Sequence, residues 1–318
     1  MVGTVPVSSP AQAMALMAST VGPYLTTMPD GETTRPNWII ELIERRDRRP
    51  DLRVLRRSRM SEPRPLRPVR DSPRYTPRKG QRVTTETLGL PYLIDAMRSW
   101  PEFLRTLTDH NLEDAWFQVG IPSPVIVAAC SWANPMRFYP IEAVAAAEQV
   151  ARIHQITEGR AVFQLEIPLE TVAVCRAPRR LRSRVARHWA KVLAGFVSAC
   201  PEGSVWIVHL CRGNKHDTPL VSPTDVAGET EMANELHSHW PTLSHPLTAV
   251  HFPFGDRLRP APNTAEYYAP LKDLVLPDRV HTSAGVVRPE ATLRQHREAM
   301  ECVESASGRQ WGCPHRVV

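Results

Sequence analysis

The sequence lacks the features that mark membrane, secreted and disulfide-rich proteins. Its best apolar run, Val125–Ala129, is far shorter than the about 18 residues of a membrane-spanning helix, so we expect no membrane association. Six cysteines in 318 residues do not make a disulfide scaffold, and we interpret them as thiols or ligands. The first residues show no positively charged segment followed by an apolar core. We therefore expect no secretory signal and a cytoplasmic protein.

Glycine-rich phosphate loops are also absent. No G-x-G-x-x-G and no Walker-type motif occurs in the sequence, which argues against a nucleotide-binding sheet. Hydrophobic residues make up 42% and charged residues 23% of the chain, values that exclude a collagen-like or wholly disordered protein. The length allows one large domain, two small ones, or a barrel of about 250 residues with insertions.

The positive charge of the chain is concentrated in one segment. The formal net charge is +6, but residues 45–79 alone hold fourteen Lys and Arg against four Asp and Glu, so the other residues sum to −4. We expect residues 45–80 to form a basic, proline-rich insertion or loop. Proline recurs from Pro63 onward and predicts that this half is extended and loop-like, because proline lacks an N–H and restricts its predecessor. Clustered arginine is typical of polyanion binding, but only Tyr75 interleaves as an aromatic. We favour either a solvated, partly mobile loop or a segment whose arginines pair with acidic residues of the rest of the chain. Binding of nucleic acid is a minor hypothesis.

Outside this segment, strand and helix patterns alternate. Apolar spacing predicts helices at 11–21, 38–48, 90–107, 141–158, 179–200, 224–240, 266–271 and 289–306. Strands are expected at 115–120, 161–167, 205–210, 247–252 and 280–285, with a last element at 309–313. Repeated strand–helix alternation indicates parallel βα units. The sequence therefore predicts an α/β fold, a single (β/α)8 TIM barrel domain over 1–318 with a basic, proline-rich insertion near its N-terminus.

Polar residues gather where the predicted strands end, which is where barrels carry their chemistry. His209 and Cys211 are two residues apart at one strand end, so their side chains point to one side. An imidazole and a thiolate suit zinc. Cys313 in the last element and His251 at the end of an intervening strand would complete a Cys2His2 set. A buried structural thiol at 211 and a core histidine at 251 are the alternatives.

Gln164 and Glu166 place an amide and a carboxylate at the neighbouring strand end. A buried carboxylate is costly unless it meets a cation, hydrogen-bond donors or a proton. We favour recognition of a substrate amine or a general acid–base role for Glu166. An ion pair with Arg176, Arg179 or Arg180 is the alternative.

A third polar group precedes the insertion. Asp30-Gly31-Glu32, followed by Arg35 and Trp38, forms a turn with two carboxylates and a guanidinium. By its chemistry alone, this turn is a helix cap with internal salt bridges.

At these residues the chain resembles the C-terminal barrel of cobalamin-independent methionine synthase, whose superfamily includes uroporphyrinogen decarboxylase. Points of similarity extend over nearly the whole chain. They comprise a glycine–serine-like opening at Val2-Gly3-Thr4-Val5-Pro6, a PDGE segment within 25–33, a Q-x-D-E-P-like strand at Gln164-Leu-Glu166-Ile-Pro168, an H-x-C-x-G-like segment at His209-Leu-Cys211-Arg-Gly-Asn214, a strand at Ala284-Gly285-Val286-Val287, and Cys313 at the position of the last zinc cysteine. Two departures stand out: His251 replaces the family's glutamate ligand, and Pro314 follows Cys313 in place of glycine.

The resemblance implies zinc-activated thiol chemistry. Zinc lowers the pKa of a bound thiol, and the resulting thiolate attacks an alkyl carbon of a donor. The implied ligands are His209, Cys211, His251 and Cys313; the implied catalytic residues are Glu166 and Asp30; the implied substrate contacts are Thr4, Glu32, Gln118, Gln164, Asn214 and Ser283. The first hypothesis is therefore zinc-dependent methyl or alkyl transfer to a small thiol acceptor. With room for one barrel only, methyltetrahydrofolate need not be the donor.

Two other hypotheses stand beside the first. One is a metal-free decarboxylase or lyase of the same superfamily, which uses carboxylate and arginine contacts. The other, from a different class, is a polyanion-binding module that acts through residues 45–79. Zinc content separates the first two, and salt-dependent binding of RNA or DNA tests the third.

Overall fold

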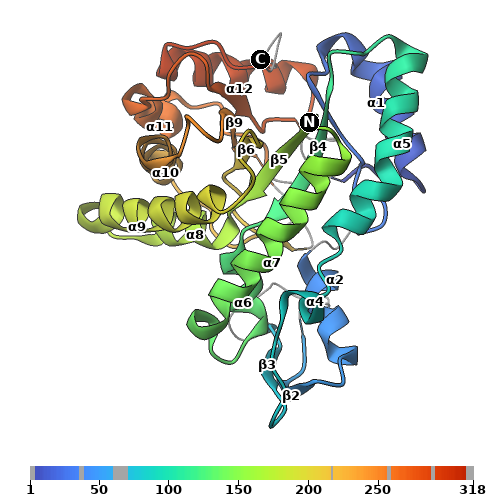
Figure 1. Ribbon diagram of the computed structural model, residues 1–318. Helices are drawn as coiled ribbons and strands as arrows, with labels where there is room; N and C mark the ends of the chain where they lie inside the picture. The colour runs from blue at the N-terminus through green and yellow to red at the C-terminus, as the bar shows by residue number, and fades with distance from the viewer. Residues whose placement is uncertain are drawn as a thin grey trace.

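A computed structural model of the chain describes residues 4–35, 39–59, 71–215, 218–255, 259–287 and 291–312. Its centre is a curled sheet of six parallel strands, a half-barrel, with helices packed around it (Figure 1). The strand order is the chain order: β1 (Thr27–Pro29), β4 (Trp116–Pro122), β5 (Ala161–Glu166), β6 (Val205–His209), β9 (Leu247–Phe252) and β10 (His281–Ala284). Each strand thus pairs with its successor, as in a singly wound βα fold.

Helices occupy the connections between these strands. They are α1 (Pro10–Val21) before β1, α5 (Tyr92–His110) before β4, α6 (Pro124–Ser131) and α7 (Pro135–Ile156) before β5, α8 (Pro168–Arg176) and α9 (Arg179–Ser198) before β6, α10 (Ala227–His239) before β9, α11 (Ala265–Tyr268) and the 3₁₀ turn η3 (Ala269–Asp273) before β10, and α12 (Leu293–Ser307) after it. The predicted strand at 247–252 is confirmed with the same bounds. The helix predicted from 141 begins earlier, at Pro135, because the Asn134 side chain caps it.

The two faces of the sheet have different environments. Outward-facing side chains such as Phe163, Trp206 and Val250 are fully buried in the main core under the helices. Val162, Val205 and Ile207, which alternate with them, form a small separate cluster on the inner face.

Register arranges the inner face in rows. One row comprises Gly120, Gln164, Ile207, Ala249 and His281, and the next, nearer the carboxyl ends of the strands, comprises Pro122, Glu166, His209, His251 and Ser283. The second row carries three titratable groups side by side, those of Glu166, His209 and His251.

The expected last strand, 309–313, differs from the structure. Residues 309–312 follow α12 without forming a strand, although the Gly312 N–H donates to the Thr282 carbonyl of β10 at 3.3 Å. The segment therefore lies alongside β10, held there by one backbone hydrogen bond. Cys313 lies outside the described residues.

The basic insertion is partly built into the molecule. Between β1 and α5 the described residues form α2 (Ile39–Glu44), the 3₁₀ turn η2 (Arg45–Arg48), the strands β2 (Leu52–Arg56) and β3 (Arg74–Pro77), and α4 (Thr85–Leu88). β2 and β3 pair antiparallel and project at the lower end of the molecule in Figure 1. Residues 60–70, which include Pro63, and Trp38 lie outside the described residues.

Arginines of the insertion contact the rest of the protein. Arg46 is 1% exposed and donates to both carboxylate oxygens of Glu142 at 2.6 and 3.0 Å, while the Trp132 indole N–H donates to the same carboxylate at 2.6 Å. Arg74 donates to the Ala129 carbonyl at 3.1 Å. These contacts support the interpretation that such arginines pair with the remainder of the chain.

Among the described residues, no helix has both the length and the hydrophobicity to cross a membrane.

Candidate metal centre

The strongest cluster of metal-ligand groups lies at the carboxyl ends of β5 and β6. One ligand atom each from Glu166, His209 and Cys211 lies within 4.8 Å of the other two. The Glu166 and His209 side chains are buried, with His209 Nε2 3.7 Å from Glu166 Oε2. The structure thus brings together the two residues of the H-x-C segment and the carboxylate on the next strand.

A tight turn, rather than the strand itself, brings Cys211 to this cluster. β6 ends at His209, and the Cys211 N–H donates back to the His209 carbonyl at 2.8 Å, a three-residue turn centred on Leu210. The Gly213 N–H then donates to Cys211 Sγ at 3.3 Å. Gly213 has φ +69°, and a Cβ there would lie 2.6 Å from the Leu220 side chain, so only glycine fits.

A buried ion pair anchors the loop that follows Cys211. Arg212 donates from Nε to Glu229 Oε1 at 2.7 Å and from Nη2 to the Tyr267 hydroxyl at 2.7 Å. Glu229, on α10, is fully buried. Because Arg212 directly follows Cys211, these two contacts restrict where the thiol can lie.

His251 contacts His209 instead of joining the three-ligand group. The two Nδ1 atoms are 2.6 Å apart, a distance that requires one ring to donate and the other to accept. Burial lowers the pKa of His209 to about 4 and lowers that of His251 well below its ordinary value, so both rings are neutral at pH 7. If His209 Nδ1–H is the donor, His209 Nε2 keeps the lone pair that a metal needs. His251 therefore has the position of a partner that orients His209, not of a ligand as the sequence suggested.

Glycine at 285 makes room for the His251 ring. A Cβ at Gly285 would lie 2.9 Å from His251 Cε1 and 3.0 Å from His251 Nε2. Real Cβ atoms essentially never lie this close to another heavy atom, so a side chain at position 285 would force the His251 ring to move. The position of the ring therefore depends on glycine at 285.

A row of buried side chains connects β1 to Glu166. The Thr27 hydroxyl donates to Gln118 Oε1 at 2.5 Å, Gln118 Nε2 donates to Gln164 Oε1 at 2.6 Å, and Gln164 Nε2 donates to Glu166 Oε1. Since an ionised carboxylate only accepts, its presence sets the orientation of both amides and of the hydroxyl. Among the described residues, Glu166 forms no ion pair with Arg176, Arg179 or Arg180, which removes that alternative.

In the absence of a bound cation, burial disfavours the charged forms of Glu166 and Cys211. Burial, and secondarily the charge of Glu32, raises the pKa of Glu166 well above its ordinary value, while the Gln164 hydrogen bond opposes this change. Burial likewise raises the pKa of the Cys211 thiol, and the carboxylates of Glu166 and Glu170 add to this effect. A bound divalent cation reverses both tendencies, because it stabilises carboxylate and thiolate together. Carboxylate, imidazole and thiolate are the ligand types that zinc takes, and three of them leave a position for substrate.

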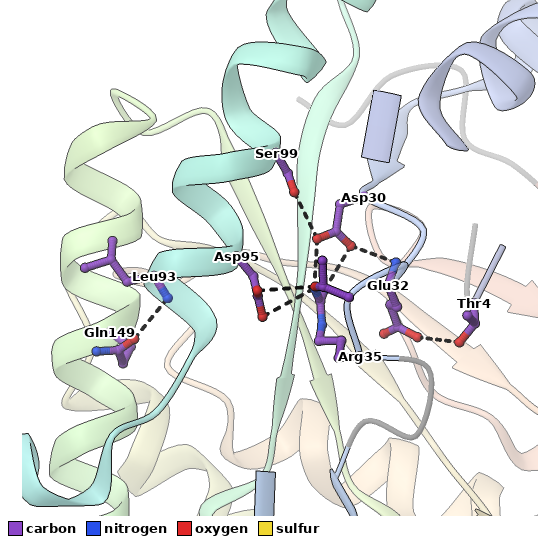
Figure 2. A network of polar contacts seen from close by, with 9 residues as sticks. Thr4, Asp30, Glu32, Arg35, Leu93, Asp95, Ser99 and Gln149 are labelled. Carbon is purple, nitrogen blue, oxygen red and sulfur yellow. Dashed lines mark hydrogen bonds and ion pairs between the residues drawn. The ribbon is translucent and has the colours of Figure 1, made fainter. Parts of the chain in front are cut away.

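Asp30 lies in a different network. Arg35 donates to its two carboxylate oxygens at 2.8 and 2.9 Å, Ser99 donates at 3.2 Å, and the Glu32 N–H donates at 2.9 Å (Figure 2). Arg35 also lies 3.7 Å from Asp95. The internal-salt-bridge interpretation of this turn is thus what the structure shows, and Asp30 stabilises the turn that carries Glu32.

The other expected substrate contacts lie at different places. Thr4 donates to Glu32 Oε2 at 2.9 Å (Figure 2), and the charge of Glu32 contributes to the raised pKa of Glu166. Ser283 is the register partner of His251. Asn214 lies in the short strand β7 (Asn214–Lys215), which pairs with β8 (Thr218–Pro219), and its side chain is outside the described part.

A cavity of about 540 Å³ adjoins the cluster on the inner face of the sheet. Gln164 and His251, which contact Glu166 and His209, are part of its wall. Residues that sequence reasoning did not select also line it: Thr27, Ile207, Ala249 and, from α12, Leu293, His296, Arg297 and Met300. The amphipathic pattern of α12 predicts a helix with a buried face but carries no signal for which cavity that face covers.

Sequence reasoning also missed a carboxylate on α8. Glu170 is fully buried, accepts a 2.5 Å hydrogen bond from the Ser123 hydroxyl, and has its pKa raised to about 7 by burial. It follows Glu166 by four residues, a spacing that could have drawn attention to it.

The chain matches no protein-family model and no curated protein. The geometry of the site therefore carries the functional conclusion.

Proposed function

We propose that this protein is a zinc-dependent methyl- or alkyltransferase that acts on a small thiol. The observation that carries the proposal is the convergence of Glu166, His209 and Cys211 within 4.8 Å at the carboxyl end of a parallel half-barrel. The resemblance to the cobalamin-independent methionine synthase superfamily rests on the same residues. It supports a relationship of this half-barrel to complete (β/α)8 barrels, and it makes Cys313 a candidate further ligand.

The residues of the chain have distinct roles in this proposal. Glu166, His209 and Cys211 would hold zinc, which would supply a Lewis acid able to keep a substrate thiol deprotonated. His251 fixes the tautomer of His209, and the Gly213 N–H stabilises negative charge on Cys211 Sγ at 3.3 Å. Gln164 fixes the orientation of the Glu166 carboxylate through its amide.

Metal content of the purified protein is the primary test. We expect close to one zinc per chain by inductively coupled plasma mass spectrometry, lost in C211A and H209A. The variant C302A is a matched control, since Cys302 is another thiol of the chain but lies on α12 outside the three-ligand group. C313A tests the additional ligand. Zinc-loaded protein is then assayed for alkyl transfer over a panel of small thiols and methyl donors.

One observation favours a second candidate. Without a cation, burial and the charge of Glu32 raise the pKa of Glu166 well above its ordinary value, and a buried carboxylic acid beside a cavity is suited to protonate a carbanion left by decarboxylation. This metal-free decarboxylase or lyase predicts that activity survives complete removal of zinc but is lost in E166Q. An active, metal-free protein would contradict the first proposal and support the second.

A further inference from the structure

The cavity on the inner face has a largely apolar wall, and the ionisable residues in this wall are all of the basic type. Ile207 and Ala249 line it from the sheet, Val286 from the segment after β10, and Leu293 and Met300 from α12. At about 540 Å³ it is within the size range of cavities that enclose small organic ligands. Leu293 is 65% exposed, so the apolar wall extends to the rim of the cavity.

The ionisable residues of the wall are all basic. They are His251, His281, His296 and Arg297, and no aspartate or glutamate is among the described lining residues. Arg297 stands at the exposed rim on α12 and forms no ion pair with any described residue. Its neighbour Arg294, one turn earlier and outside the cavity wall, pairs with Glu298 at 2.7 Å. Of these two arginines, Arg297 lines the cavity and can pair with an anionic ligand, whereas Arg294 is already paired with Glu298.

The deep end of the cavity is polar but uncharged. Thr27, Gln118 and Gln164, whose side chains carry no charge, form its hydrogen-bonded row. A charged group placed there would lose its hydration without meeting an opposite charge. At the rim, in contrast, an anion keeps part of its water and gains a charge-assisted hydrogen bond from Arg297. The two ends therefore prefer different ligand groups.

We infer that this cavity binds an amphipathic carboxylate: an anionic group at Arg297, an apolar chain between the sheet and α12, and at most a neutral polar group at the Gln118–Gln164 end. This goes beyond the proposed function, because the cavity wall contains none of the three metal ligands. The binding can accordingly be tested in protein stripped of metal with a chelator, so that it stands or fails separately from alkyl transfer.

The test compares three probes of equal chain length by isothermal titration calorimetry: octanoate, octan-1-ol and octylamine. The full-length, chelator-treated protein should bind octanoate most tightly and octylamine most weakly. R297Q should weaken octanoate binding about 5- to 10-fold and leave octan-1-ol unchanged, as expected for the loss of one charge-assisted contact. R294Q, which removes the same charge from the same helix outside the wall, should leave octanoate binding unchanged.

A second variant tests the location. A249F fills the middle of the cavity and should abolish binding of octanoate and octan-1-ol alike, provided that circular dichroism shows a folded protein. R297Q, on the exposed side of α12, keeps the test valid if A249F does not fold. Equal or tighter binding of octylamine, an unchanged octanoate affinity in R297Q, or no binding of any probe would overturn the inference.

Discussion

The role of His251 at the candidate metal centre can be tested without substituting any of the candidate ligands. It contacts His209 at 2.6 Å without belonging to the three-ligand group, and Gly285 leaves the space for its ring. Partners that orient a ligating histidine typically contribute about 10- to 100-fold to metal affinity. The contribution of His251 can be probed without touching any ligand, by filling the space at 285.

We therefore expect G285A to lower zinc affinity by about 10-fold or more, measured by competition with a chromophoric chelator. The added methyl group, 2.9 Å from His251 Cε1, pushes the ring away from His209. G195A is the control: Gly195 lies in α9 with open space around it, so zinc affinity should not change and the helix should gain up to about 1 kcal/mol. An unchanged zinc affinity in G285A would remove His251 from the site.

Glu170 carries a second prediction at the residue scale, on pH. Burial raises its pKa in the folded protein to about 7, above the ordinary value of the unfolded chain. The folded state therefore binds this proton more tightly, and the associated stability, complete at low pH, is lost as pH rises through about 7. The difference in pKa corresponds to roughly 3 kcal/mol at about 1.4 kcal/mol per pH unit.

E170Q removes this titration. Urea unfolding of metal-free protein at pH 5 and pH 8 should show the wild type losing up to about 3 kcal/mol relative to E170Q between the two values. S123A, which deletes the donor to the ionised carboxylate, should enlarge the loss. A difference between wild type and E170Q that does not vary with pH would show that Glu170 titrates normally.

At the scale of elements, the loop after β6 positions Cys211 through the Arg212–Glu229 pair. R212Q leaves the Glu229 carboxylate charged and fully buried without its cation, a change that typically costs about 3–5 kcal/mol. Chemical denaturation should show this loss, and zinc affinity should fall with it. R187Q is the matched control, since Arg187 pairs with Glu235 at 3.1 Å but is 54% exposed; its loss of stability should be much smaller than that of R212Q. Equal losses in both variants would contradict a special role of the buried pair.

The elements also show what sequence patterns can predict. The run LTAVHF predicts β9 to the residue, because five of its six residues are apolar or β-branched and turn signals stand on both sides. β1 is three residues long and ends in Pro29, too short for any periodicity to reveal it. The place of Cys211 depends on a turn at Leu210, which the two-residue spacing does not encode even though it correctly predicts that Cys211 lies near His209.

At the scale of the molecule, the site depends on strand pairing that no local pattern specifies. Glu166, His209 and His251 are neighbours only because β5, β6 and β9 pair in this register, and the β6–β9 ladder shifts register between Trp206 and Ile207. One residue of slippage would turn His251 to the helix-covered face. The predicted parallel α/β architecture is confirmed, whereas the half-barrel arrangement and the place of α12 at the cavity depend on long-range packing.

Because the candidate ligands come from two central strands of one sheet and from the turn that follows one of them, metal binding should stabilise the whole fold. Zinc that binds only the folded state at 100 times its Kd contributes about 2.7 kcal/mol, which corresponds to a rise in Tm of several degrees for a chain of this size. We expect differential scanning calorimetry to show a Tm that rises with free zinc concentration in wild type and C302A. In C211A the rise should disappear, since the thiolate is lost from the three-ligand group. A Tm that rises equally in C211A would place the zinc elsewhere on the molecule, and a Tm independent of zinc would contradict a metal centre built into the sheet.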